Sequence, residues 1–278
     1  MSTVRDLFDL QNRVAIITGG AGFLGIRHAE AIAEMGGLPV LLDVDEERVK
    51  SAAETIARKY RTTVTGIVAD ITKPDSVSNA LGLISQRFDG AHILINNAAN
   101  NPKVEGARPS NVQWSRLENF PFERWEQDIA VGLTGAFLCS QIIGADFARR
   151  GRGVILNIAS DLGVIAPDQR IYREQNVPDE EQPVKPVSYS VVKHGIIGLT
   201  RYLATYWADR GVRVNSLSPG GVENGQDPAF VERLVNLIPL KRMAKPDEYK
   251  AAIVFLVSDA SSYMNGANLI IDGGRSVW

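Results

Sequence analysis

Three residues in the second half of the chain have types and a spacing that suit proton transfer. Tyr189 and Lys193 stand four residues apart in an expected helix, so they share one helix face. A nearby ammonium stabilises a phenolate and lowers the pKa of a tyrosine below its usual value of about 10. Such a tyrosine can take a proton from an alcohol or return it to a carbonyl. Ser160 ends an apolar run upstream, and its hydroxyl can hydrogen-bond the reacting oxygen.

Tyrosine and lysine four residues apart are also common on helix surfaces, so the rest of the sequence must decide. Near the N-terminus, an apolar run leads into a glycine-rich turn and then into a helical pattern. Such a turn approaches a pyrophosphate closely, and the free N–H groups of the helix start favour negative charge. The same spacing also occurs in tight connections without a ligand. We expect a dinucleotide to bind at Gly19, Gly22, Phe23, Leu24 and Gly25.

An acidic residue follows the turn at the distance expected for a ribose ligand. Asp43 ends the second apolar run, 18 residues after Gly25, and a carboxylate about 20 residues on accepts hydrogen bonds from the adenosine ribose. A 2′-phosphate would meet like charge there, and neither the turn nor Val44 supplies a cation. The sequence therefore predicts NAD as the cofactor, although an acid at a strand end is also common without this role.

Polar and small residues follow the next two apolar runs. They suit the adenine and the second ribose, or they simply form turns. The residues expected to contact the cofactor here are Asp70, Ile71, Asn97, Ala98 and Ala99.

Apolar runs of strand length alternate with helical patterns along the whole chain. This alternation predicts a single α/β domain over residues 1–278, with a doubly wound, seven-stranded parallel sheet of the Rossmann type. The expected strands are Val14–Thr18, Pro39–Leu42, Thr65–Val68, Ile93–Asn96, Gly153–Ile158, Val212–Leu217 and Asn268–Ile271. The expected helices cover residues 24–36, 46–60, 74–87, 122–149, 189–210 and 246–258.

Two stretches, residues 100–121 and 161–187, are long for loops of a compact domain. Each follows the carboxyl end of an expected strand, where open α/β sheets bind ligands. We expect them to form a lid over the substrate, with plain surface insertions as the alternative.

Composition narrows the function further. The formal charge is −2, and Lys and Arg form no long run, so nothing suggests a nucleic-acid partner. Three histidines and one cysteine are scattered, which argues against a metal site or a disulfide framework. No export signal precedes the first strand, and no apolar stretch approaches the ~20 residues that span a bilayer. We expect a cytoplasmic protein without membrane partners.

Taken together, these motifs resemble the short-chain dehydrogenase/reductase family, in its short single-domain form, from about residue 10 to residue 278. The similarity rests on the glycine turn, residues 96–99, Ser160, the Tyr189/Lys193 pair, Pro219-Gly220 and the Asp-Gly-Gly sequence at 272–274. The resemblance implies that Ser160, Tyr189 and Lys193 are catalytic, and that NAD is the cofactor. It further implies that Tyr189, Lys193, Pro219, Gly220 and Val222 contact the cofactor, and that the protein is a homotetramer.

The chain departs from the family pattern in three places. The glycine spacing is that of longer, epimerase-like members. Gly132 stands where the family has an asparagine, so a proton relay cannot run through a side chain there, and a water or another residue must replace it. Ser160 and Tyr189 are 29 residues apart, whereas about a dozen is usual. Tyr172 is nearer the usual distance, but Asn176 occupies the position of the lysine, so we rank Tyr172 below Tyr189.

The insertions are where substrate specificity is expected. Their side chains suit hydroxyls and a carboxylate or phosphate, as in a sugar or sugar acid, unless they only keep exposed loops soluble. These side chains are Asn100, Asn101, Lys103, Arg108, Arg116, Asp168, Gln169, Arg170, Tyr172 and Arg173, of which Asn100, Arg170 and Tyr172 are the candidate substrate residues. The insertions and C-terminus also resemble a subgroup linked to bacterial surface-sugar biosynthesis.

Three functions follow from these features. The first is an NAD-dependent oxidoreductase that interconverts a secondary alcohol and a ketone of a polyhydroxylated substrate. The second is a dinucleotide-binding sensor or scaffold without turnover, which Gly132 favours. The third is a sugar epimerase or dehydratase with tightly bound NAD, which the glycine spacing favours.

Overall fold

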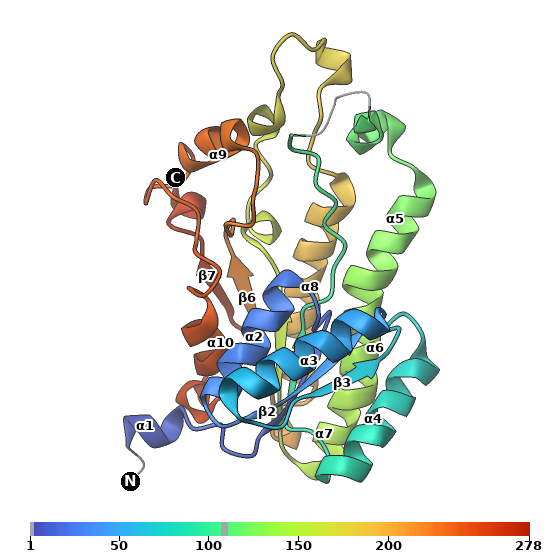
Figure 1. Cartoon of the computed structure of the whole chain (residues 1–278), viewed down its shortest axis with the longest axis vertical. Coiled ribbons are helices and arrows are strands. Elements are labelled where there is room, and N and C mark those ends of the chain that lie inside the picture. Colours follow the sequence, from blue (N-terminus) through green and yellow to red (C-terminus); the bar gives the residue numbers. More distant parts are fainter. Residues whose placement is uncertain (1–2, 107–110) are drawn as a thin grey trace.

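A seven-stranded parallel sheet forms the centre of the molecule (Figure 1). The computed structural model describes residues 3–106 and 111–278. The strand order is β3-β2-β1-β4-β5-β6-β7, which confirms the doubly wound single-domain prediction. The strands are β1 (Val14–Thr18), β2 (Leu38–Asp43), β3 (Thr65–Val68), β4 (Ile93–Asn96), β5 (Gly153–Ile158), β6 (Val212–Pro219) and β7 (Asn268–Ile271). Only β2 and β6 are longer than predicted.

The apolar runs are strands because the sheet is buried on both faces. All five residues of β1 are buried. Ala15 and Ile17 join the hydrophobic cluster on one face, while Val14 and Ile16 join the cluster on the other. Alternating side chains thus feed two apolar layers, and this is why the sequence shows continuous apolar runs without polar alternation.

Helices cover both faces of the sheet. Helices α2, α3 and α10 share one hydrophobic cluster, and α4, the long α5–α7 helix and α8 lie on the other face (Figure 1). The predicted helices are all present, but the short α1 and α9 were missed. The helices are α1 (Val4–Leu7), α2 (Phe23–Glu34), α3 (Glu46–Tyr60), α4 (Pro74–Phe88), α5 (Phe122–Ile129), α6 (Gly135–Cys139), α7 (Ala145–Arg150), α8 (Val187–Tyr206), α9 (Pro228–Val235) and α10 (Lys250–Val257).

The long helix departs from the expectations in two ways. Two π-helical turns, Ala130–Thr134 and Ser140–Gly144, separate α5, α6 and α7. Moreover, Phe122–Arg150 is long and apolar enough to cross a membrane, so the prediction that no stretch approaches this length is wrong. Length and composition alone are weak evidence for a membrane, because core helices of soluble proteins meet the same criteria. Here the helix contributes Cys139, Ile143 and Phe147 to the core beneath the sheet.

The two insertions are packed parts of the domain. Both contain 3₁₀ turns, and they lie with α9 at the upper end of the molecule in Figure 1. Val104 and Val112 from the first insertion and Ile171 and Tyr172 from the second share a hydrophobic cluster with Phe230 of α9. The second insertion is further held by Gln182, whose side chain bonds the backbone of Glu174 and Val177.

Strand order changes direction between β1 and β4. The chain moves outward from β1 to β2 and β3, then returns to place β4 on the other side of β1. Loops at the carboxyl ends of these two strands therefore diverge and leave a crevice, which is the usual ligand site of an open α/β sheet.

Candidate active site

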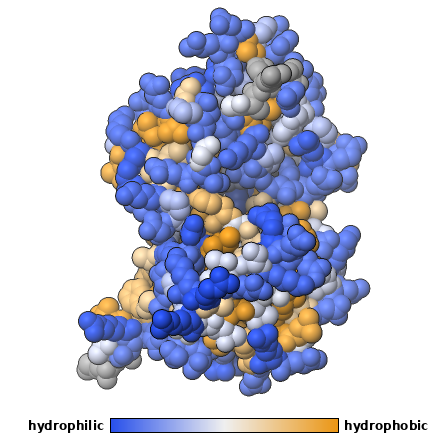
Figure 2. Space-filling model, viewed as in Figure 1, coloured by the Kyte–Doolittle hydropathy of each residue, from blue (hydrophilic) through white to orange (hydrophobic). Residues whose placement is uncertain are grey.

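A cavity of about 690 Å³ occupies this crevice and extends beneath the insertions. Figure 2 shows a hollow across the middle of the molecule, with apolar and neutral residues along it and hydrophilic residues around it. One end is lined by the glycine turn and the ends of β2 and β3, the other by the ends of β5 and β6, the start of α8 and both insertions. The cavity brings together all the predicted site residues except Gly25 and Arg170.

The glycine turn needs residues without a side chain, because backbone segments approach each other closely there. Gly19 has a φ of +60°, and a Cβ there would lie 3.0 Å from the Cα of Ala98. A Cβ on Gly25 would collide with the Gly19 carbonyl, so Gly25 supports the turn from behind without lining the cavity. Gly22 is the N-cap of α2 and has no side chain that could cap the helix. The backbone N–H groups of the first turn of α2 are therefore available to bind an anion. This cradle fits a dinucleotide pyrophosphate.

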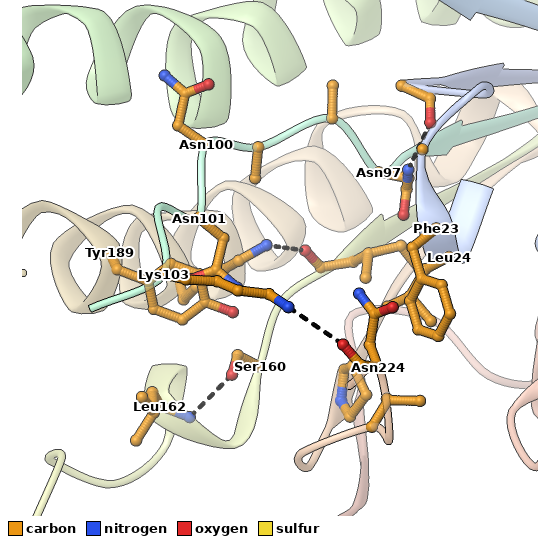
Figure 3. Close-up of a pocket in the computed structure, with 18 of the residues that line it drawn as sticks. Phe23, Leu24, Asn97, Asn100, Asn101, Lys103, Ser160, Leu162, Tyr189 and Asn224 are labelled. Atoms are coloured by element: carbon orange, nitrogen blue, oxygen red, sulfur yellow. Dashed lines mark hydrogen bonds between the residues drawn. The ribbon is translucent and has the colours of Figure 1, made fainter. Parts of the chain in front are cut away.

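The ends of β1 and β4 are joined by side chains. The Asn97 amide donates to the carbonyls of Thr18 and Gly19, at 3.0 and 3.2 Å. The backbone N–H groups of Asn97 and Ala98 donate to the Thr18 hydroxyl, at 3.0 and 3.1 Å. These bonds hold the ends of β1 and β4 together, and Figure 3 shows Asn97 at this junction. Asn97 therefore holds the turn in shape as well as lining the site.

Asp43 lies beside the glycine turn, as predicted. Its carboxylate accepts from the N–H of Ala21 at 3.1 Å and lines the cavity. A cation also lies near this position, contrary to the expectation from the sequence. Arg48, on the first turns of α3, also lines the cavity and donates to the Ala21 carbonyl at 3.0 Å. A carboxylate and a guanidinium thus stand together where the adenosine ribose would bind.

The remaining predicted cofactor residues line the cavity at both of its ends. Asp70 is held by Thr72, whose N–H and hydroxyl donate to one carboxylate oxygen at 2.9 and 2.6 Å, and these bonds lower the pKa of Asp70. The other residues that line the cavity as predicted are Ile71, Ala98, Ala99, Pro219, Gly220 and Val222.

The predicted catalytic residues meet at the chemical end of the cavity. Tyr189 and Lys193 lie one turn apart on α8, and the Lys193 ammonium is 5.6 Å from the centre of the Tyr189 ring. Lys193 is buried and donates to the Ile158 carbonyl of β5 at 2.8 Å. Ser160, two residues further on, faces the same space as Tyr189 (Figure 3). One phenol, one hydroxyl and one ammonium therefore line the same part of the cavity.

The direction of the pKa shift of Tyr189 differs from the prediction. Burial raises the pKa of Tyr189 to about 12, with the Asp161 carboxylate acting in the same direction, and contact with Ser160 opposes this. Burial also lowers the pKa of Lys193 to about 8. Desolvation is the largest cause of both shifts, because burial disfavours the charged form of each group.

A buried ion pair lies directly behind Ser160. The Asp161 carboxylate accepts from the Ser160 hydroxyl at 2.8 Å and from Arg275 Nη1 at 2.8 Å. The side chains of Arg275 and Asp161 are only 7% and 5% exposed. The C-terminal segment thereby reaches back across the sheet to hold the residue next to the predicted catalytic serine.

Gly132 is required by packing against α8. It is buried in the first π-helical turn, and a Cβ there would lie 2.6 Å from Cγ1 of Val192. An asparagine therefore does not fit unless Val192 moves. In the described part of the chain, the hydrogen-bond acceptor for Lys193 is the Ile158 carbonyl.

The candidate substrate residues have different positions. Tyr172 is buried in the cavity wall, 5.2 Å from Phe230 between ring centres, and burial raises its pKa. Asn100 lines the cavity, but its amide points away from Tyr189 and Ser160 (Figure 3). Arg170 does not line it: the side chain is 81% exposed and pairs with Asp168. The prediction for Arg170 is therefore wrong, because a neighbouring carboxylate holds it at the surface.

The other polar insertion residues divide in the same way. Asn101 and Lys103 line the cavity, and Lys103 donates to the Asn224 carbonyl at 3.1 Å (Figure 3). Arg116 bonds the Asp179 carbonyl at 2.9 Å and thus joins the two insertions. The residues outside the cavity lining are Arg116, Asp168, Gln169 and Arg173, and Arg108 lies outside the described residues.

Sequence reasoning missed five charged residues that line the cavity: Arg48, Glu105, Asp161, Lys185 and Arg275. Lys185 carried a signal, because it precedes Tyr189 by the same four residues that separate Tyr189 from Lys193. Asp161 also carried one, as the neighbour of Ser160. Arg275 carried none, since its contact spans 114 residues of sequence.

Comparison with known proteins agrees with this geometry. Residues 13–172 match the family model described as short chain dehydrogenase, and residues 178–276 match the one described as Enoyl-(Acyl carrier protein) reductase. This chain belongs to the short-chain dehydrogenase family. It is therefore a dehydrogenase/reductase acting on CH–OH groups, as the sequence analysis predicted.

Similar proteins of the family act on polyols and sugar acids. The chain is 32% identical over 275 residues to D-threitol dehydrogenase of Mycolicibacterium smegmatis, covering 97% of this chain and 95% of that protein. It is 34% identical over 275 residues to NAD-dependent glycerol dehydrogenase of Listeria innocua, covering 97% and 96%. The structure of a gluconate 5-dehydrogenase from Burkholderia cenocepacia, in complex with NADP and tartrate, has a TM-score of 0.85 at 27% identity and covers 99% of this chain and 100% of that one.

Proposed function

We propose that the chain interconverts a secondary alcohol and a ketone of a polyol, sugar or sugar acid, with NAD as the cofactor and Tyr189 as the general acid/base. The observation that carries the proposal is the meeting of Tyr189, Ser160 and Lys193 in the cavity that the glycine turn opens. The similarity to dehydrogenases of threitol, glycerol and gluconate supports the substrate class.

NAD is favoured over NADP by the position of Asp43. Its carboxylate is fixed beside the turn, where it can accept hydrogen bonds from a ribose diol and repel a 2′-phosphate. Arg48 acts in the other direction, and the similar proteins include an NAD-dependent enzyme and a structure with NADP. We give Asp43 the larger weight, because it stands 18 residues after Gly25, close to the distance at which a carboxylate accepts hydrogen bonds from the adenosine ribose.

The chain's own residues divide the chemistry among them. NAD, when bound, supplies the hydride acceptor. Tyr189, as the phenolate, takes the proton of the substrate hydroxyl and becomes a neutral phenol, and Lys193 balances the negative charge that the phenolate carries before this transfer. The Ser160 hydroxyl donates its one proton to Asp161 in this structure, and it turns this proton to the reacting oxygen when the substrate binds. Tyr172 forms part of the cavity wall on the side of the second insertion.

The test is the formation of NADH from a panel of neutral and acidic polyols by the purified protein. We expect NADH absorbance to appear with at least one member and to exceed that seen with NADP. Cofactor binding without any substrate-dependent absorbance would favour the sensor or scaffold. Nucleotide released only on denaturation, with no net NADH in solution, would favour the epimerase or dehydratase.

Four further expectations remain predictions: closure of the insertions as a lid, a homotetrameric assembly, a cytoplasmic location and membership of the surface-sugar subgroup. The packed cluster formed by both insertions with α9 supports a substrate-side role for them. Protection of the insertions from proteolysis on adding NAD and substrate would test the lid.

A further inference from the structure

A second ammonium lies beside the Tyr189 ring, on the side of the insertions. Lys185 Nζ is 4.0 Å from the ring centre, closer than Lys193 Nζ at 5.6 Å. Lys185 belongs to the second insertion, two residues before α8 begins, and it lines the cavity. The proposed proton transfer already uses Lys193, so Lys185 needs another explanation.

Lys185 is held firmly at both ends. Its backbone N–H donates to Gln169 Oε1 at 2.8 Å, and its ammonium donates to Asn101 Oδ1 at 2.6 Å. The first bond comes from the second insertion and the second from the first insertion. A long, flexible side chain that is fixed in this way aims its charge at one place in the cavity.

The Lys185 ammonium lacks a carboxylate partner within ion-pair distance in the described part of the chain. Asn101 satisfies one of its three hydrogens, and Asn101 is neutral. Two carboxylates lie nearby, but Arg275 holds Asp161, and Glu105 accepts from the Val104 N–H at 3.1 Å. The remaining hydrogens of this ammonium belong to a charge that lines the cavity, and they favour an anionic group of a ligand as their acceptor.

We propose that Lys185 binds an anionic group of the substrate, a carboxylate or a phosphate, and thereby selects charged over neutral polyhydroxylated substrates. This inference rests on the proposed function, because it places the anion on the molecule whose hydroxyl faces Tyr189. The charges at this end of the cavity agree with it. Lys103, Lys185, Lys193 and Arg275 line it against Glu105 and Asp161, an excess of cations among the described residues.

The pKa of Lys185 fits this role. Burial lowers it to about 8, Arg275 acts in the same direction, and the Glu105 and Asp161 carboxylates oppose the shift. The repulsion between Lys185 and Lys193 also lowers the pKa of Lys193. An anion bound at Lys185 would relieve both desolvation and repulsion, so its binding should weaken as the pH rises above 8.

The experiment compares matched substrates in three forms: a neutral alditol, its aldonate and its terminal phosphate, each in the gluco, manno and galacto configurations. We expect the wild type to have its highest kcat/KM for a charged form. Lys185→Met should lower that value by about tenfold to a hundredfold and leave the neutral alditol nearly unchanged. Lys185→Arg should restore part of the loss. The charged form that shows the selective loss identifies the group as carboxylate or phosphate.

Lys245→Met is the control, because Lys245 is exposed and lies outside the cavity lining. A wild type that prefers the neutral alditols would overturn the inference while leaving the proposed function intact. An equal loss for charged and neutral substrates in Lys185→Met would also overturn it, and would indicate that Lys185 acts through Tyr189. Should no substrate be turned over, the proposed function fails. Calorimetry with D-gluconate and D-glucitol 6-phosphate against D-glucitol then decides on Lys185, and equal affinity for all three would exclude it.

Discussion

The two ends of the cavity are built in different ways. The cofactor end is made mostly of backbone: Gly19 approaches Ala98, and Asn97 ties two neighbouring strand ends together. The chemical end is made of charged side chains from distant segments. Arg275 reaches Asp161 across 114 residues, and Lys185 reaches Asn101 across 84.

This difference explains why one end is generic and the other specific. Backbone cradles depend on a few glycines and on strand order, so similar proteins can share them while differing elsewhere. Side-chain contacts between insertions change with every substitution, and this is where a family can vary its substrate.

Tyr189→Phe should have the largest effect. Loss of the phenol removes the proton acceptor, so kcat should fall by about 10²- to 10⁴-fold while NADH affinity stays near the wild-type value. Steady-state rates and fluorescence titration with NADH measure the two quantities. Tyr172→Phe is the matched control, since it removes another buried phenol of the same cavity. If Tyr172→Phe were the inactive variant, the assignment would have to be exchanged.

Arg275→Met should destabilise the fold and impair the chemical end. It leaves the Asp161 carboxylate buried without its partner, at a cost of about 3–5 kcal/mol. Chemical denaturation measures this, and kcat should drop because Ser160 loses its support. Arg170→Met removes an exposed partner of Asp168 and should cost less than about 1 kcal/mol. Equal losses of unfolding free energy in the two variants would mean that burial does not strengthen the ion pair between Asp161 and Arg275.

Asp43→Asn should affect only the cofactor end. Without the negative charge, the preference for NAD over NADP should shrink by about tenfold to a hundredfold, with little change in substrate KM. Dissociation constants for both cofactors measure the preference. Arg48→Gln should move it in the opposite direction, because it removes the cation that would meet a 2′-phosphate. An unchanged ratio in Asp43→Asn would show that the ribose binds elsewhere.

Oxidation should accelerate as the pH rises through about 8. The pKa of Lys193 is near 8 and that of Tyr189 is near 12, and because these two groups interact, the pair loses its first proton near the lower value. A base must have lost a proton before it can accept one, so kcat/KM for oxidation should rise about tenfold per pH unit below 8. Ketone reduction needs the proton and should slow over the same range. Initial rates between pH 6 and 10 provide the measurement, and a flat oxidation profile would contradict this assignment.

Gly132→Ala should have the smallest effect. The added Cβ presses on Val192 and should cost about 1–3 kcal/mol of unfolding free energy. Activity per folded molecule should persist, because no side chain at 132 takes part in the chemistry. Gly82→Ala on α4 is the control: nothing lies within 4 Å of its added Cβ, so it should stabilise the helix by up to about 1 kcal/mol. A thermal melt of each variant provides the comparison.

The sequence by itself determined the order and most boundaries of the strands and helices. It also located the glycine turn, Asp43, Ser160 and the Tyr189/Lys193 pair. These features depend on local patterns: apolar runs for buried strands, glycines for close backbone approach and fixed spacings on a helix. Even the 29 residues between Ser160 and Tyr189 did not hide the pair, because the spacing within α8 is local.

Only the tertiary structure decided which charges reach the cavity. In the folded chain Arg170 lies at the surface, whereas Arg48, Lys185 and the Asp161–Arg275 pair line the cavity. The tertiary structure also explained Gly132 through its contact with Val192. The position and ionisation of a charged side chain depend on burial and on partners far away in the sequence, and no local spacing encodes these.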